Sequence, residues 1–114
     1  MSETIDRATF TALQETAGAE FVVELVDTFI EESPGLLAEL RSARAERNGE
    51  RFRRAAHSLK SNAGTFGAVR LAAKARELEL RGLDPEPARD VEALAALDAE
   101  HTRATAALKA LCNG

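Results

Sequence analysis

Apolar residues recur at helical spacing along almost the whole chain, and only short stretches rich in Gly, Pro and Asn interrupt them. These breaks predict a short helix over about 6–15 and longer helices over about 19–32, 50–64, 68–81 and 88–111. A short helix followed by four longer ones with brief connections predicts an all-α fold, an antiparallel four-helix bundle with a short extra N-terminal helix. The aromatic content of 4%, with no Trp or Tyr, also favours close-packed helices over a β-sandwich.

Helix boundaries are indicated by a few residues with strong backbone preferences. Asp6 is expected to cap the first helix and Gly18 to end it. Ser33-Pro34 resembles an N-cap followed by proline in the first turn, so the chain either restarts a helix there or kinks and continues to about Arg47. The apolar positions that we expect to anchor this region are Phe21, Leu25, Phe29, Leu36, Leu37 and Leu40.

Length, charge and cysteine content exclude several classes of protein. The 114 residues fit a single domain over residues 1–114. A net charge of -4 argues against general nucleic-acid binding, and no run of 18 apolar residues predicts a membrane span. The single cysteine, Cys112, cannot form an internal disulfide, and two histidines without carboxylates at ligand spacing do not predict a metal site. We therefore expect a cytoplasmic protein, and the start at Met1 favours a standalone one.

The predicted helix over 50–64 separates a core face from a polar face that carries a histidine. His57, Lys60, Ser61 and Gly64 stand at positions i, i+3, i+4 and i+7, so they form one stripe. The opposite side of this helix is expected to be core, and it consists of Phe52, Ala55, Ala56, Leu59 and Ala63. The pattern predicts that His57 points mainly to solvent.

This stripe suits phosphoryl transfer between proteins. A neutral imidazole nitrogen is a good nucleophile near pH 7, and exposure lets another protein reach it. Lys60 can place an ammonium near phosphoryl oxygens, while the small residues Ser61 and Gly64 leave room for a partner's active site to close over His57. If the next helix is antiparallel around Gly67, Glu79 lies at about the level of His57 and can accept a hydrogen bond from its Nδ1–H. That contact would leave Nε2 free to attack.

The segment over 55–67, Ala-Ala-His-Ser-Leu-Lys-Ser-Asn-Ala-Gly-Thr-Phe-Gly, resembles the signature of histidine-containing phosphotransfer (HPt) domains, roughly A-H-x-L-K-G, five residues and G. It is especially similar to the phosphotransfer domain of bacterial chemotaxis kinases, and residues 32–37 and 78–79 extend the resemblance. The resemblance implies a four-helix bundle with His57 as phosphoacceptor, Lys60 as the positive residue and Gly67 as the turn glycine. It also implies that Glu79 orients His57. Ser61 departs from the family pattern, where glycine is commonest.

The family implies a phosphoryl carrier rather than an enzyme, acting in a two-component phosphorelay. Its expected partners are a histidine or hybrid kinase and the receiver domains of response regulators. We expect a monomer without a cofactor of its own, because the receiver domain would supply the magnesium. No Gly-rich phosphate-binding loop indicates an ATP site in this chain.

Two other interpretations remain open from the residues alone. The chain can be the dimerisation and phosphoacceptor domain of a histidine kinase, although Ser58 stands where those domains usually have an acidic residue. It can also be a helical interaction module that uses no phosphate. His101 lies on an apolar stripe and is expected to be a buried or boundary residue with one hydrogen-bond partner. We expect a solvated face, which can help attract an acidic receiver, from Arg41, Arg44, Arg47, Arg51, Arg53 and Arg54.

Overall fold

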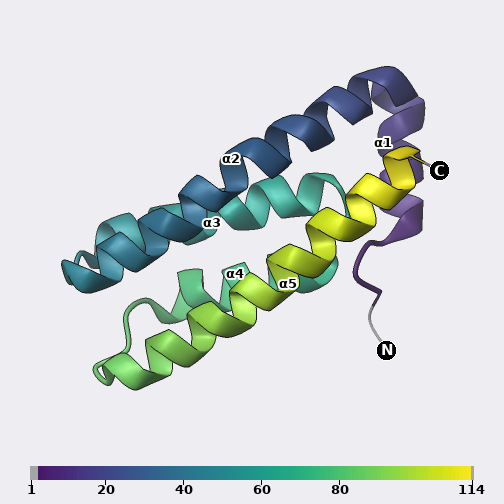
Figure 1. The fold of residues 1–114 in the computed structure, drawn as a ribbon. Coiled ribbons are helices and arrows are strands. Elements are labelled where there is room, and N and C mark those ends of the chain that lie inside the picture. The colour runs from purple at the N-terminus through teal and green to yellow at the C-terminus, as the bar shows by residue number, and fades with distance from the viewer. Residues whose placement is uncertain (1–2, 114) are drawn as a thin grey trace.

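Four long helices run side by side in the computed structural model, which describes residues 3–113, and a shorter helix crosses one end of them (Figure 1). Within the described residues there are five helices and no strand: α1 (Arg7–Ala17), α2 (Ala19–Ala45), α3 (Gly49–Thr65), α4 (Val69–Arg81) and α5 (Pro87–Asn113). α3 packs against α2 and α4, and α5 closes the ring by packing against the same two helices. The predicted all-α bundle with an extra N-terminal helix is confirmed.

The core fills the space between the four long helices and consists mainly of Leu, Ala and Phe side chains. All five residues predicted for the inner face of α3 are buried: Phe52, Ala55, Ala56, Leu59 and Ala63. No helix within residues 3–113 is both long and apolar enough to cross a membrane.

At Ser33-Pro34 the structure decides between the two predicted alternatives. α2 continues through Pro34 to Ala45, so the alternative of continuation is confirmed, and the Ser33 side chain is buried instead of capping a new helix. Proline removes one backbone hydrogen bond, but the buried residues Phe29 and Leu37 on either side hold both halves of the helix against the core. The prediction that Phe21 anchors this helix is wrong, because Phe21 is 50% exposed and Val22 occupies the core position instead.

A glycine at the end of the α3–α4 turn ties this hairpin to the start of the chain. Gly67 has φ +78, and its carbonyl accepts a 2.7 Å hydrogen bond from the backbone N–H of Asp6. A Cβ at this position would lie 2.8 Å from the Asp6 carbonyl oxygen, so only glycine fits without a shift. Asp6 precedes α1 as predicted, but its carboxylate accepts a hydrogen bond from the Thr9 hydroxyl and caps no backbone N–H.

Candidate functional site

The candidate site lies on the solvent face of α3, a helix fixed at both ends by its own sequence. The Asn48 side chain accepts a hydrogen bond from the backbone N–H of Arg51 and caps the start of α3. The turn at Gly67 follows its end. With the apolar face buried, the His57 side chain is 58% exposed, as the helical spacing predicts. The imidazole is therefore accessible to another protein.

Glu79 of α4 reaches across the hairpin to His57. Its Oε2 lies 2.6 Å from His57 Nδ1, so the contact predicted from the antiparallel turn is present. Because an ionised carboxylate can only accept hydrogen bonds, this contact places the proton of a neutral imidazole on Nδ1. No group within residues 3–113 is hydrogen-bonded to Nε2. Nε2 is thus left with its lone pair.

Lys60 contacts the other oxygen of the same carboxylate. Its Nζ lies 2.7 Å from Glu79 Oε1, so one carboxylate joins the imidazole and the ammonium. The hydrogen bonds from Lys60 and, second, from His57 hold the pKa of Glu79 below its usual value, against the opposing effect of partial burial. Glu79 is therefore an anion at neutral pH, which preserves both contacts. The ammonium of Lys60 lies beside Glu79, one helical turn from His57.

Small side chains keep the surface beyond His57 low. Ser61 and Gly64 are both exposed. A Cβ added to Gly64 would have no neighbour within 4 Å, so this glycine faces open space. The structure thus places both residues on the same exposed stripe as His57, as predicted.

The arginines near the site divide into two groups. Arg53 and Arg54 are exposed, and they line a shallow depression together with Glu50, His57, Ser58 and Glu79. Arg41 and Arg47 are exposed as well, so the prediction of a solvated arginine face is wrong only for Arg44 and Arg51, which are partly buried. Acidic residues on neighbouring segments engage three of the six arginines. Arg41 pairs with Asp98, Arg44 with Asp90, and Arg51 with Glu39 and Glu46.

His101 does not belong to the exposed site. It is half-buried on α5, and its Nε2 lies 2.6 Å from the hydroxyl oxygen of the buried Ser33 on α2. Burial lowers the pKa of His101, and the nearby Asp98 opposes this shift. The prediction of a boundary histidine with one hydrogen-bond partner is confirmed, and that partner is Ser33, which the sequence predicts as a helix cap.

The sequence does not indicate the most buried charged side chain among residues 3–113. Asp90 is fully buried and accepts hydrogen bonds from Arg81 Nη2 at 2.6 Å and from the backbone N–H of Asp84. Arg44 Nε lies 2.8 Å from its other oxygen. Nothing in the local sequence distinguishes Asp90 from the many exposed acidic residues. Among residues 3–113, no group of three His, Cys, Asp or Glu side chains is arranged to hold a metal ion.

Comparisons with known proteins identify the family to which the chain belongs. The model of the Hpt domain matches residues 24–110, about three quarters of the chain. The chain is also similar to the crystal structure of histidine-containing phosphotransfer protein B from Pseudomonas aeruginosa PAO1, with 29% sequence identity and a TM-score of 0.72. That similarity covers 99% of this chain and 94% of the other. No curated protein matches the sequence.

Proposed function

Since the chain belongs to the Hpt domain family, we propose that it carries the phosphoryl group of its phosphorelay on His57. Histidine phosphotransfer in a two-component phosphorelay is the function that the family and the similar structure support. The observation that carries the assignment to His57 is the contact between its Nδ1 and Glu79, which leaves Nε2 exposed as the nucleophile. His101 is half-buried and its Nε2 is engaged by Ser33, so it does not compete.

The transfer consists of two reversible displacements at phosphorus. In the first, the Nε2 lone pair of His57 attacks the phosphorus of an aspartyl phosphate on a receiver domain, and the P–O bond to the aspartate breaks. In the second, an aspartate oxygen of another receiver attacks the same phosphorus, and the electron pair of the N–P bond returns to Nε2. Nδ1 keeps its proton throughout, and Glu79 offsets the positive charge that develops on the ring.

The two partners divide the remaining work. The receiver domain supplies magnesium and most of the groups that stabilise the transferring phosphoryl. This chain acts as a monomeric carrier without a cofactor of its own. Lys60 lies close enough to turn from Glu79 toward the phosphoryl oxygens, while Ser61 and Gly64 give the receiver clearance. Kinases and receiver domains are its partners.

Incubation with a labelled, phosphorylated receiver domain tests this proposal. We expect an acid-labile label to move to the wild-type chain and to the His101→Gln variant, but not to His57→Gln. A helical module that uses no phosphate would acquire no label in any variant. If His57→Gln accepts the label as well as the wild type does, the assignment of the phosphoacceptor is wrong. A dimeric mass in solution would instead favour the dimerisation domain of a histidine kinase.

A further inference from the structure

Two exposed arginines precede His57 on α3 by one helical turn. Arg53 and Arg54 stand four and three residues before the histidine, so all three side chains are neighbours on the helix surface. Both arginines line the depression that His57 and Glu79 also border. Neither arginine forms an ion pair with another residue among 3–113. The site therefore contains two cations that the network of Glu79 does not use.

The imidazole leans toward these arginines. Helical side chains point back toward the N-terminus of their helix, so the ring of His57 extends over the turn of Arg53 and Arg54. Because Nδ1 contacts Glu79, Nε2 is the ring nitrogen left for a phosphoryl group. Lys60 stands one turn after His57, on the other side along the helix. A phosphoryl group on Nε2 would thus lie between Lys60 and the two arginines.

Lys60 is already engaged by a carboxylate, whereas Arg53 is not. Lys60 Nζ lies 2.7 Å from Glu79 Oε1, so turning fully toward a phosphoryl group would break a contact that helps to keep Glu79 ionised beside His57. A phosphoryl group carries a charge of about -1.5 to -2 near pH 7 and offers three acceptor oxygens. The forked guanidinium of an arginine can bind two such oxygens at once. Arg53 can therefore supply a contact that breaks no existing ion pair.

The two arginines differ in how strongly the surrounding carboxylates attract them. The hydrogen bond from Arg51 and, more weakly, the charge of Arg54 hold the pKa of Glu39 on α2 below its usual value. Arg54 is thus within the field of a carboxylate on the neighbouring helix. Glu50 borders the same depression, and among residues 3–113 it forms no ion pair with either arginine. Arg53 is consequently the more available cation.

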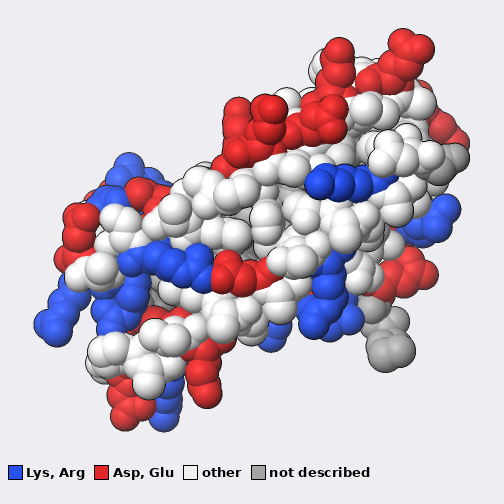
Figure 2. All heavy atoms as spheres, viewed as in Figure 1, with Lys and Arg blue, Asp and Glu red and all other residues white. Residues whose placement is uncertain are grey.

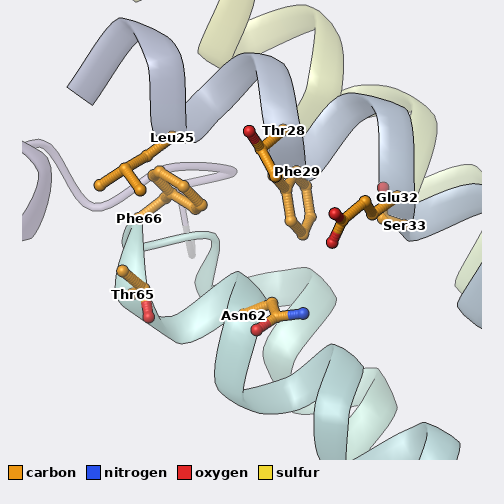
Figure 3. Close-up of a pocket in the computed structure, with 8 residues that line it drawn as sticks. All are labelled: Leu25, Thr28, Phe29, Glu32, Ser33, Asn62, Thr65 and Phe66. Atoms are coloured by element: carbon orange, nitrogen blue, oxygen red, sulfur yellow. The ribbon is translucent and has the colours of Figure 1, made fainter. Parts of the chain in front are cut away.

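No cation lines the hollow on the α2 side of His57, among the residues that the structure describes. Figure 3 shows that hollow between α2 and α3, and the polar residues labelled there are neutral or acidic: Thr28, Glu32, Ser33, Asn62 and Thr65. Figure 2 shows acidic side chains gathered over the N-terminal half of α2. The charge distribution therefore attracts a phosphoryl group toward Arg53 and away from α2.

We propose that Arg53 binds the phosphoryl group of phosphorylated His57, with Arg54 as a weaker second cation. The guanidinium donates hydrogen bonds to the phosphoryl oxygens that face the depression, while Lys60 stays beside Glu79. The inference rests on the proposed function, because it requires a phosphoryl group on Nε2. Since this contact exists only in the phosphorylated state, it shifts the phosphoryl equilibrium toward this chain.

Phosphorus NMR of the phosphorylated chain tests the contact without a receiver domain. Phosphoramidate serves as the donor: Nε2 of His57 attacks its phosphorus, the P–N bond of the reagent breaks and ammonia leaves. The signal that His57→Gln lacks is then followed as a function of pH. A nearby cation favours the dianion, so Arg53→Gln should raise the pKa of the phosphoryl group, with about threefold weaker acid dissociation. Arg54→Gln should have a smaller effect in the same direction.

Three further variants separate a direct contact from a general effect of charge. Arg7→Gln is the matched control, because Arg7 is exposed on α1 and forms no ion pair among residues 3–113, and it should leave the titration unchanged. Arg53→Lys keeps the charge and should restore most of the wild-type behaviour. Glu50→Gln removes a carboxylate from the same depression, so it should lower the pKa of the phosphoryl group instead.

The phosphoryl equilibrium provides a second readout. When the chain is mixed with a phosphorylated receiver domain, the equilibrium ratio of phosphorylated chain to phosphorylated receiver does not depend on how tightly the two proteins dock. Arg53→Gln should lower this ratio about threefold, whereas Arg7→Gln should not change it. An unchanged ratio for Arg53→Gln would contradict the stabilisation of the phosphorylated state.

Failure of the inference and failure of the function give different results. If phosphoramidate labels no wild-type protein, the proposed function is wrong and the role of Arg53 is wrong with it. If the label appears but Arg53→Gln titrates as the wild type does, only the phosphoryl-binding role is wrong. An equal shift for Arg53→Gln and Arg7→Gln would likewise overturn that role, because net charge alone would then explain the result.

Discussion

At the scale of single residues, one carboxylate organises the site. Glu79 contacts the imidazole through one oxygen and the Lys60 ammonium through the other, so neither group can shift without affecting the second. The arrangement fixes the tautomer of His57 and keeps a cation within reach of the proposed phosphoryl position. Its parts come from α3 and α4 alone.

Glu79→Gln is expected to slow phosphoryl transfer about tenfold without unfolding the protein. The amide keeps the size of the side chain but loses the charge that fixes the Nδ1 proton and offsets the developing positive ring. A charge-assisted hydrogen bond contributes about 1.5 kcal/mol or more, which corresponds to about tenfold in rate. The measurement is the initial rate of transfer from a phosphorylated receiver. Glu77→Gln serves as the control, and equal rates for both variants would contradict the role of Glu79.

The α3–α4 hairpin and α1 meet at Gly67, which makes this turn critical at the scale of the elements. Gly67→Ala is expected to lower the free energy of unfolding by about 3 kcal/mol, from the strain of a positive φ and the contact of its Cβ with the Asp6 carbonyl. Urea denaturation measures the change.

Gly18→Ala provides the matched comparison for this turn. Gly18 also has a positive φ, +95, but a Cβ there has no neighbour within 4 Å. Gly18→Ala should therefore lower the free energy of unfolding by the backbone strain alone, about 1 kcal/mol. If the two variants are equally stable, the contact between the turn and Asp6 contributes nothing.

The pair Ser33–His101 joins α2 to α5 and makes that interface sensitive to pH. Because burial lowers the pKa of His101, the unfolded chain binds a proton on this residue at a higher pH than the folded chain does. The stability that neutral His101 contributes is thus complete above pH 6.5, the ordinary pKa of histidine. It is lost as pH falls from there through the lower pKa of the folded state. We expect wild type to lose more stability than His101→Gln between pH 7.5 and 5.5. Urea denaturation at both pH values checks this, and parallel losses would contradict it.

The elements also show where sequence reasoning succeeds and where it stops. The face of α3 was predicted correctly because its apolar residues form one narrow stripe among polar ones. In α2, Phe21, Val22 and Val23 are consecutive apolar residues, so periodicity cannot decide which of them faces the core. The contact between His57 and Glu79 was predictable because a short turn fixes the register of two neighbouring helices.

At the scale of the whole molecule, local sequence patterns do not predict the contacts between distant segments. Ser33 has the sequence pattern of a helix cap, yet its hydrogen-bond partner, His101, lies on another helix. The arginines of the α2–α3 region gave the signal of a solvated surface, yet three of them find acidic partners through the fold. Such pairings depend on the packing of the bundle, which only the three-dimensional structure provides.

Asp90 is the clearest case of such packing, because it connects α2, α4 and the start of α5. Asp90→Asn removes the charge that two arginines share in a buried position, so we expect the free energy of unfolding to fall by about 3 kcal/mol. Thermal or urea denaturation measures it. Glu92→Gln, an exposed change on the same helix, should stay within about 0.5 kcal/mol of wild type. A similar small effect for Asp90→Asn would show that the network does not stabilise the fold.

The confinement of the His57–Lys60–Glu79 network to the α3–α4 hairpin has a consequence for how related chains diverge. All three residues belong to two helices that a short turn joins, and α1, α2 and α5 contribute none of them. After gene duplication, substitutions on the outer faces of the other helices can therefore accumulate while the contacts within this network stay intact.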